Sequence, residues 1–203
     1  GVQTCALPIS AALAQKFGER SHFHSFYFNS GNVRDVFRAR AQILESSLEA
    51  INYELDWAFP PREHKGKIRL GVLAFDFAAR TETFVTLPVF RELDRSRFEV
   101  NLFALRGDGG TMERLCAQHA AHFTVLPADL QAQVKLMRDA DLDLLFIGGN
   151  VTAAATDLTA IALHRLARVQ MTGICCCVTT GMRNIDQFLS GTLSEPEIGR
   201  AHV

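Results

Sequence analysis

The sequence predicts an α/β fold built on a Rossmann-like parallel sheet, preceded by a helical segment. Between residues 67 and 191, short apolar runs alternate with amphipathic stretches, which is typical of strand–helix–strand units. The run at 142–147 (LDLLFI) is apolar almost throughout, as expected for a parallel strand that is covered on both faces. With 203 residues, 48% of them hydrophobic, the chain can bury one full core and carry a helical appendage.

The segment before the sheet is predicted to contain one amphipathic helix that runs from Asn32 to about Leu55. Asparagine is a residue type that caps helix N-termini. After it, apolar residues recur at alternating four- and three-residue steps, which places them on one helix face. They are Phe37, Ala41, Leu44, Leu48, Ile51 and Leu55. Pro60 and Pro61 end the helix, so residues 10–61 form a helical linker region and residues 62–196 form the Rossmann-like lobe.

Within the lobe, local signals mark where strands give way to helices. Pro88 is expected to bend the first helix, Gly107 and Gly110 make a turn after the second strand, and Asp129 caps the helix after the third strand. The predicted strands are 68–75, 98–105, 123–126, 142–147, 168–174 and, as part of a sixth, 188–190. The predicted helices are 81–93, 112–121, 156–166 and the one that follows Asp129.

Composition excludes several classes of partner. The net charge of -1 gives no electrostatic reason to expect binding to nucleic acid or to an anionic membrane. No apolar run reaches the roughly 18 residues of a membrane helix. Five cysteines, three of them adjacent at 175–177, do not suggest a disulfide framework. A reducing, cytoplasmic setting is therefore expected.

Both ends of the chain have a foreign appearance. Residues 1–9 (GVQTCALPI) and 197–203 (EIGRAHV) resemble translated adapter oligonucleotides of the kind used in short-read sequencing. They are interpreted as artefacts and left out of the fold prediction. The natural protein is accordingly expected to continue beyond both ends, which would make this chain a fragment.

In a doubly wound sheet, the loops after the first, fourth and fifth strands share one edge, where ligands bind. They are residues 76–81, 148–152 and 175–181. The first loop has no glycine-rich dinucleotide or phosphate-loop pattern, so a nicotinamide or flavin dinucleotide is disfavoured. Gly149 and Asn150 in the second loop could approach a ligand or form an ordinary turn. Thr179, Thr180 and Gly181 in the third suit a phosphate or a sugar.

Other polar groups are interpreted as structural, and no metal is expected. A zinc site is not expected at Cys116, His119 and His122, because three-residue steps do not keep them on one helix face and no carboxylate completes the set. The histidines at 22 and 24 are attributed to aromatic packing. The three adjacent cysteines lack redox spacing and are expected to be small buried side chains. The acidic residues Asp139, Asp141 and Asp143 are expected to be solvated, on the edge opposite the cleft.

Several pieces, in order and at matching distances, resemble the catalytic region of O-linked N-acetylglucosamine (O-GlcNAc) transferases and their bacterial relatives. The pieces are IRLGV at 68–72 with DF at 76–77, FEV at 98–100 with FAL at 103–105, RVQ at 168–170, VTTGM at 178–182 and ID at 185–186. The resemblance covers residues 67–196. It implies one lobe of a two-lobed GT-B enzyme that moves N-acetylglucosamine from UDP to serine or threonine hydroxyls with inversion and without a metal. It also implies a protein or peptide acceptor and tetratricopeptide repeats upstream.

The resemblance implies a set of candidate site residues, and at several of these positions the sequence differs from the family's motifs. Arg80 stands where the family has a histidine, and because arginine stays protonated it cannot act as a base but can stabilise leaving-group charge. Asp76 is the acid near the first loop and the candidate for proton handling. Cysteines and a valine at 175–178 replace the family's Gly-Tyr-Pro-Gly, and 149–151 replaces Gly-His-Thr. The predicted substrate-binding residues are Gly149, Asn150, Cys176, Cys177, Thr179, Thr180 and Gly181.

Two alternatives remain beside the transferase. The departures at Arg80 and at the cysteines favour a catalytically silent relative that acts as a binding or scaffold domain. A stand-alone flavodoxin-like domain would need acidic residues or a phosphate loop after the first strand, and Phe77-Ala78-Ala79 supplies neither. Because the nucleotide-binding lobe would lie outside these 203 residues, the isolated chain is expected to show no turnover.

Overall fold

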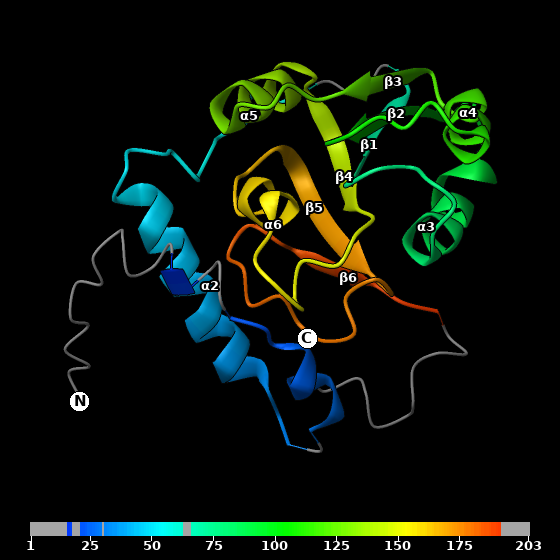
Figure 1. Ribbon diagram of the computed structural model, residues 1–203. Helices are drawn as coiled ribbons and strands as arrows, with labels where there is room; N and C mark the ends of the chain where they lie inside the picture. The colour runs from blue at the N-terminus through cyan, green and yellow to red at the C-terminus, as the bar shows by residue number, and fades with distance from the viewer. Residues whose placement is uncertain (1–15, 18–20, 30, 63–65, 192–203) are drawn as a thin grey trace.

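The computed structural model describes residues 16–17, 21–29, 31–62 and 66–191 (Figure 1). The adapter-like segments at 1–9 and 197–203 lie outside these residues. Six strands form a single parallel sheet, in the order β3-β2-β1-β4-β5-β6. The strands are β1 (Ile68–Ala74), β2 (Phe98–Ala104), β3 (His122–Val125), β4 (Leu142–Ile147), β5 (Ala167–Gly173) and β6 (Gln187–Leu189). The predicted α/β fold with a Rossmann-like parallel sheet is confirmed.

The strand order reverses at the centre of the sheet. β1 pairs with β2 on one side and with β4 on the other, in a register that places Leu73 opposite Ile147. The loops that follow β1 and β4 therefore leave the carboxyl edge side by side and in opposite directions. This is the switch point at which open α/β sheets bind their ligands.

The helices cover both faces of the sheet (Figure 1). α3 (Thr81–Arg91) and α4 (Thr111–Gln118) pack on one face, and α5 (Leu130–Asp139), α6 (Asp157–Ala162) and α2 (Arg34–Glu49) pack on the other. Side chains alternate between the two cores because successive strand residues point to opposite faces: Val72 and Phe146 belong to the α3 side, and Leu73 and Leu145 to the α5 side. Both cores are fully apolar at these positions, which explains the almost continuous apolar strands.

The helix predicted to reach Leu55 is shorter in the structure. α2 ends at Glu49, and the chain turns at Asn52, whose φ is 66°. Leu55 is nevertheless buried, because an extended segment brings it back to the lobe, where its carbonyl accepts from Arg165 N at 2.7 Å. Leu55 fits the helical spacing of apolar residues in the sequence, but in the structure it is buried by the extended segment and not by the helix. Asn32 does contribute at the N-terminus: its Oδ1 accepts from Arg34 N at 2.9 Å.

The helix predicted at 156–166 also ends early, at Ala162. A buried side chain, Gln170, is the physical reason. Its Oε1 accepts from the backbone N–H groups of Leu166 and Ala167, and its Nε2 donates to the carbonyls of His164, at 3.1 Å, and Asn184, at 2.8 Å. The strand side chain thus satisfies backbone groups that would otherwise continue the helix.

The expectation that the three aspartates are solvated is wrong for Asp143. This carboxylate is buried, with one oxygen 2.9 Å from Arg62 Nη1 and 2.8 Å from Arg69 N. Arg168 lies 3.7 Å from its other oxygen. The charge is buried because the linker and two strand starts meet at the amino edge of β4 and supply arginines.

The predicted aromatic packing is confirmed for His24, whereas His22 is exposed and forms an isolated antiparallel bridge with Ala154. His24 belongs to the 3-10 helix η1 (His24–Phe28), and its ring lies 5.0 Å from that of Tyr27. The neighbouring Phe23 packs on Phe37 of α2, and its backbone N–H donates to Ala153 O at 2.7 Å. The cluster therefore holds the N-terminal segment against the loop that follows β4.

Candidate functional site

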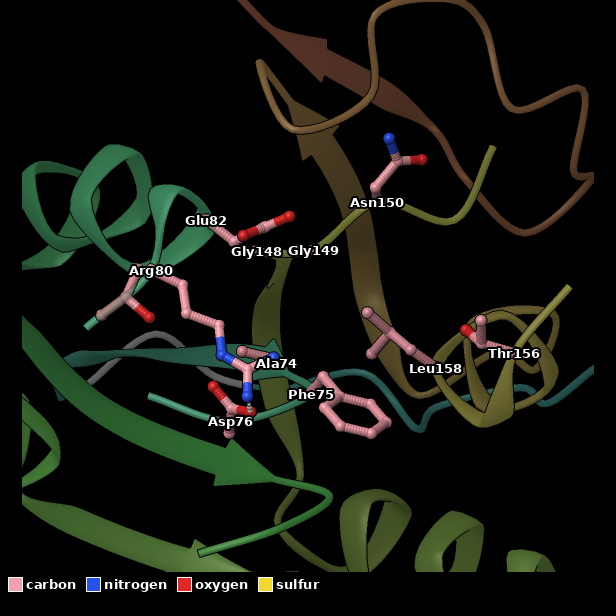
Figure 2. Close-up of a pocket in the computed structure, with 11 residues that line it drawn as sticks. Ala74, Phe75, Asp76, Arg80, Glu82, Gly148, Gly149, Asn150, Thr156 and Leu158 are labelled. Atoms are coloured by element: carbon pink, nitrogen blue, oxygen red, sulfur yellow. Dashed lines mark ion pairs between the residues drawn. The ribbon is translucent and has the colours of Figure 1, made fainter. Parts of the chain in front are cut away.

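A cavity of about 210 Å³ opens at the carboxyl edge of the sheet, at the switch point between β1 and β4 (Figure 2). Its walls come from the loop after β1, the first turn of α3, the loop after β4 and the start of α6. The lining residues are Ala74, Phe75, Asp76, Arg80, Glu82, Thr83, Gly148, Gly149, Asn150, Thr156 and Leu158. Four of the residues predicted from the sequence, Asp76, Arg80, Gly149 and Asn150, are brought together here.

Arg80 and Asp76 form an ion pair on one wall of the cavity. Arg80 Nη2 lies 3.4 Å from Asp76 Oδ2, and Figure 2 shows the guanidinium extended toward the carboxylate. Asp76 is largely buried and also accepts from Ala78 N at 3.1 Å, whereas 63% of the Arg80 side chain is exposed. The carboxylate is thus committed to holding the loop and the arginine. The guanidinium keeps donors free for an anion.

Gly148 and Gly149 begin the loop after β4 and allow it to pack closely. A Cβ on Gly149 would lie 2.4 Å from Leu158 Cδ2, and one on Gly148 would lie 2.6 Å from Thr86 Cγ2. A side chain at either position would force its neighbour, Leu158 or Thr86, to move, so glycine suits this close packing. Gly149 lines the cavity, and its packing role on α6 accounts for the glycine without any ligand.

Asn150 is held in place by a residue far away in the sequence. Its Oδ1 accepts from Thr152 N at 2.9 Å, from Ala153 N at 3.0 Å and from the Tyr27 hydroxyl at 3.1 Å. Burial raises the pKa of the Tyr27 phenol, which therefore remains a donor. With Oδ1 saturated, the Asn150 Nδ2 group is the end available to a ligand, since it has no partner among the described residues.

The three adjacent cysteines have three different environments. Cys176 is fully buried, its Sγ is 3.6 Å from Gly149 O, and burial raises its pKa to about 11. Cys175 is half-buried, with its Sγ 3.4 Å from Gly148 O. Cys177 is exposed, so the expectation of a buried run is wrong there, because the chain turns outward after β5. Cys175 and Cys176 act as protonated thiols that join the β5 loop to the β4 loop, and none of the three lines the cavity.

Thr179, Thr180 and Gly181 are not among the residues that line the cavity. They pack against α2: a Cβ on Gly181 would lie 2.4 Å from the carbonyl carbon of Phe37. Thr180 is buried, and its Oγ1 accepts from Met182 N at 3.3 Å. Thr180 therefore lies outside the cavity that Arg80 and Asn150 line. The third loop turns toward the helix that precedes the sheet.

Comparisons with known proteins agree with this architecture. No protein-family model matches the sequence, and no curated protein matches it either. Among solved structures, a point mutant of the O-GlcNAc transferase of Thermobaculum terrenum matches with a TM-score of 0.60 at 17% sequence identity. The match covers 88% of this chain and 32% of that chain, so the present chain spans about a third of its length. The fold is that of a GT-B glycosyltransferase lobe.

The first turn of α3 contributes to the cavity two polar residues, Glu82 and Thr83, that were not predicted from the sequence as site residues. Glu82 lines the cavity, is exposed, and makes no ion pair with any described residue. Thr83 is buried, and its Oγ1 has no hydrogen-bond partner in the described structure. Their position directly after the Asp76–Arg80 loop was the available signal. Tyr27 carried no signal, because its partner lies 123 residues away.

The described residues hold no group of three or more histidine, cysteine, aspartate or glutamate side chains placed to bind a metal ion. In the same part of the chain, no helix is both long enough and apolar enough to cross a membrane.

Gly181→Ala tests how tightly the third loop is docked on α2. Gly181 has a φ of +67°, and the added Cβ would meet the backbone of Phe37. We expect the free energy of unfolding to fall by about 2 kcal/mol, from left-handed strain and overpacking together. Gly109 is a matched control, since its φ is +64° and an added Cβ would meet nothing within 4 Å. Urea denaturation should show about 1 kcal/mol for Gly109→Ala, and equal losses in the two variants would contradict the docking.

Proposed function

We propose that this chain is the N-terminal catalytic lobe of an inverting glycosyltransferase that moves N-acetylglucosamine from UDP to serine or threonine hydroxyls of a protein or peptide. The observation that carries the proposal is the solvent-exposed Arg80 guanidinium, held by Asp76 in a cavity at the switch point of a GT-B-like lobe. The family resemblance of the sequence supports the choice of donor and acceptor.

In this proposal Arg80 stabilises the negative charge that develops on the UDP leaving group. Charge stabilisation of this kind contributes most when the stabilising group is held in place before the reaction. The ion pair with Asp76 holds the Arg80 guanidinium in this way. The reaction then needs no metal ion, because the guanidinium takes the role that a divalent cation has in other glycosyltransferases. Asn150 would hold the sugar through its free Nδ2 group.

Glu82 is the carboxylate best placed to accept the proton of the attacking hydroxyl. It lines the cavity without an ion-pair partner among the described residues, whereas both Asp76 oxygens are already engaged. We therefore assign the role of proton acceptor to Glu82 in place of Asp76. A second lobe would hold most of the nucleotide, and a cytoplasmic protein with upstream tetratricopeptide repeats is the expected setting.

The test is a transfer assay on the full-length protein that carries this lobe, with UDP-N-acetylglucosamine and a serine-rich peptide. Arg80→Ala should lower kcat/KM by about 100-fold through lost charge stabilisation. Glu82→Gln should lower kcat more than it raises KM. Arg91→Ala and Glu92→Gln are matched controls, since these two residues form an exposed ion pair at the far end of α3 and should leave the rate unchanged.

Absence of both transfer and UDP-sugar hydrolysis in the unmutated full-length protein would remove the enzymatic proposal. It would favour the second candidate, a catalytically silent binding domain, which the arginine at position 80 and the bulky cysteine loop support. Calorimetry with UDP separates the two ideas, because the enzyme must bind the nucleotide and a scaffold need not.

A further inference from the structure

A second cavity, of about 360 Å³, lies along α5, and none of the residues that line it lines the first cavity. It is bounded by the segment that follows α2, by α5, and by His164 just after α6. Nothing in the proposed transferase chemistry uses it.

One wall of this cavity is a fixed aromatic surface. The guanidinium of Arg138 lies 4.7 Å from the centroid of the Trp57 ring. Arg138 is itself anchored, since its Nε donates to Arg165 O at 3.1 Å and its Nη2 to Glu54 O at 2.8 Å. The indole is thus held from one side while the residue stays 44% exposed. The guanidinium covers one face of the ring, so the other face of this half-exposed indole is the one that can serve as an apolar platform for a ligand.

His164 supplies an unused hydrogen-bond acceptor in the same cavity. The residue is 1% exposed, and its Nδ1 lies 3.0 Å from Ala160 O, which requires the ring proton to be on Nδ1. Burial lowers its pKa to about 4, so the ring is neutral and Nε2 carries a bare lone pair. Nε2 has no partner among the described residues and is itself buried. An unsatisfied buried acceptor is costly, so a small shift of the cavity lining that admits a donating hydroxyl would be favourable.

The charges around the cavity cancel in pairs. Lys135 forms an ion pair with Asp139, and Arg138 Nη1 lies 3.9 Å from Glu54. The balance gives no preference for an anion or a cation. Asn52 and Gln131 add amide groups, which both donate and accept hydrogen bonds.

From these features we infer that the cavity between Trp57 and His164 is a second binding site, for one neutral pyranose ring. Such a ring has an apolar C–H face for the indole, hydroxyls that can donate to His164 Nε2, and further hydroxyls for the amides. The inference is independent of the proposed transferase reaction, because it uses none of the residues of that site.

Trp57 is the single tryptophan of the chain, so its fluorescence reports binding directly. The unmutated chain is titrated with N-acetylglucosamine and with glucose, and in parallel with the charged sugars glucosamine and glucuronate. We expect a saturable change with at least one neutral sugar and weaker binding of both charged ones. His164→Phe should weaken binding roughly tenfold by removing the acceptor while keeping the volume. Arg80→Ala, in the other cavity, should bind as the unmutated chain does.

Thermal unfolding of each variant shows whether it is folded. Should His164→Phe fail to fold, Trp57→Ala replaces it, since the indole is half-exposed and its loss leaves the core intact; calorimetry then measures the weakened binding. The inference is overturned by the absence of a saturable response to either neutral sugar, by undiminished affinity in the variant, or by tighter binding of a charged sugar. A response that Arg80→Ala abolishes would likewise overturn it, because binding would then belong to the first cavity.

Discussion

Replacing Gln170 by leucine is expected to lower the free energy of unfolding by about 4 kcal/mol, as the sum of several lost hydrogen bonds in the core. The Gln170 side chain is fully buried and satisfies four backbone groups at once, two through its carbonyl oxygen and two through its amide nitrogen. Leucine has a similar volume, so no large cavity forms. The four backbone groups would be left without partners in a place that water does not reach.

Urea denaturation of the two proteins measures this loss as a lower midpoint at an unchanged slope. Gln187→Leu is the matched control, because Gln187 lies on the next strand with its side chain exposed, and it should change stability by less than about 0.5 kcal/mol. A Gln170→Leu protein as stable as the control would mean that the hydrogen bonds at the end of α6 do not hold the lobe together.

The stability of the lobe is expected to fall by about 3 kcal/mol as the pH is lowered from 6.5 to 4, because of His164 alone. Burial lowers the pKa of His164 from 6.5 to about 4, helped by the nearby positive charge of Arg138. Between these pH values His164 is protonated in the unfolded chain but remains neutral in the folded chain. The contribution of His164 is therefore fully present above pH 6.5 and is lost as the pH falls toward 4.

The free energy of unfolding as a function of pH checks this expectation. His164→Phe should flatten the curve between pH 6.5 and 4, since it removes the titrating group. His122→Phe replaces an exposed histidine on β3 and should keep the slope of the unmutated protein. A slope that survived in His164→Phe would contradict this expectation. Asp186 would not account for it, because hydrogen bonds from Arg165 and Gln170 N outweigh the effect of burial and lower the pKa of that carboxyl, which moves its effect on stability below this window.

The order of strands and helices could be predicted because it is encoded locally. Alternating apolar runs and the Asp129 cap, which accepts from Ala132 N at 2.8 Å, act over a few residues, whereas Pro60 and Pro61 do not end α2, which stops at Glu49. Element ends were predicted less well. α2 ends in a local turn at Asn52, whereas beyond the end of α6 a distant side chain, Gln170, binds the backbone N–H groups of Leu166 and Ala167.

The candidate site was predicted in part. The parallel sheet and its switch point were enough to bring Asp76, Arg80, Gly149 and Asn150 to one cavity. They were not enough for Thr179, Thr180 and Gly181, because the path of a loop after its strand depends on what it packs against. Here that partner is α2, a helix outside the sheet.

By itself the sequence determined the class of fold, the direction of the strands and the edge of the sheet at which the Asp76–Arg80 cavity opens, since hydrophobic periodicity and sheet topology settle these. Only the tertiary structure decided that Tyr27 fixes Asn150 and that Asp143 is buried among arginines. Each of these depends on residues far apart in the chain being placed within a few ångströms, and no local pattern specifies such a contact.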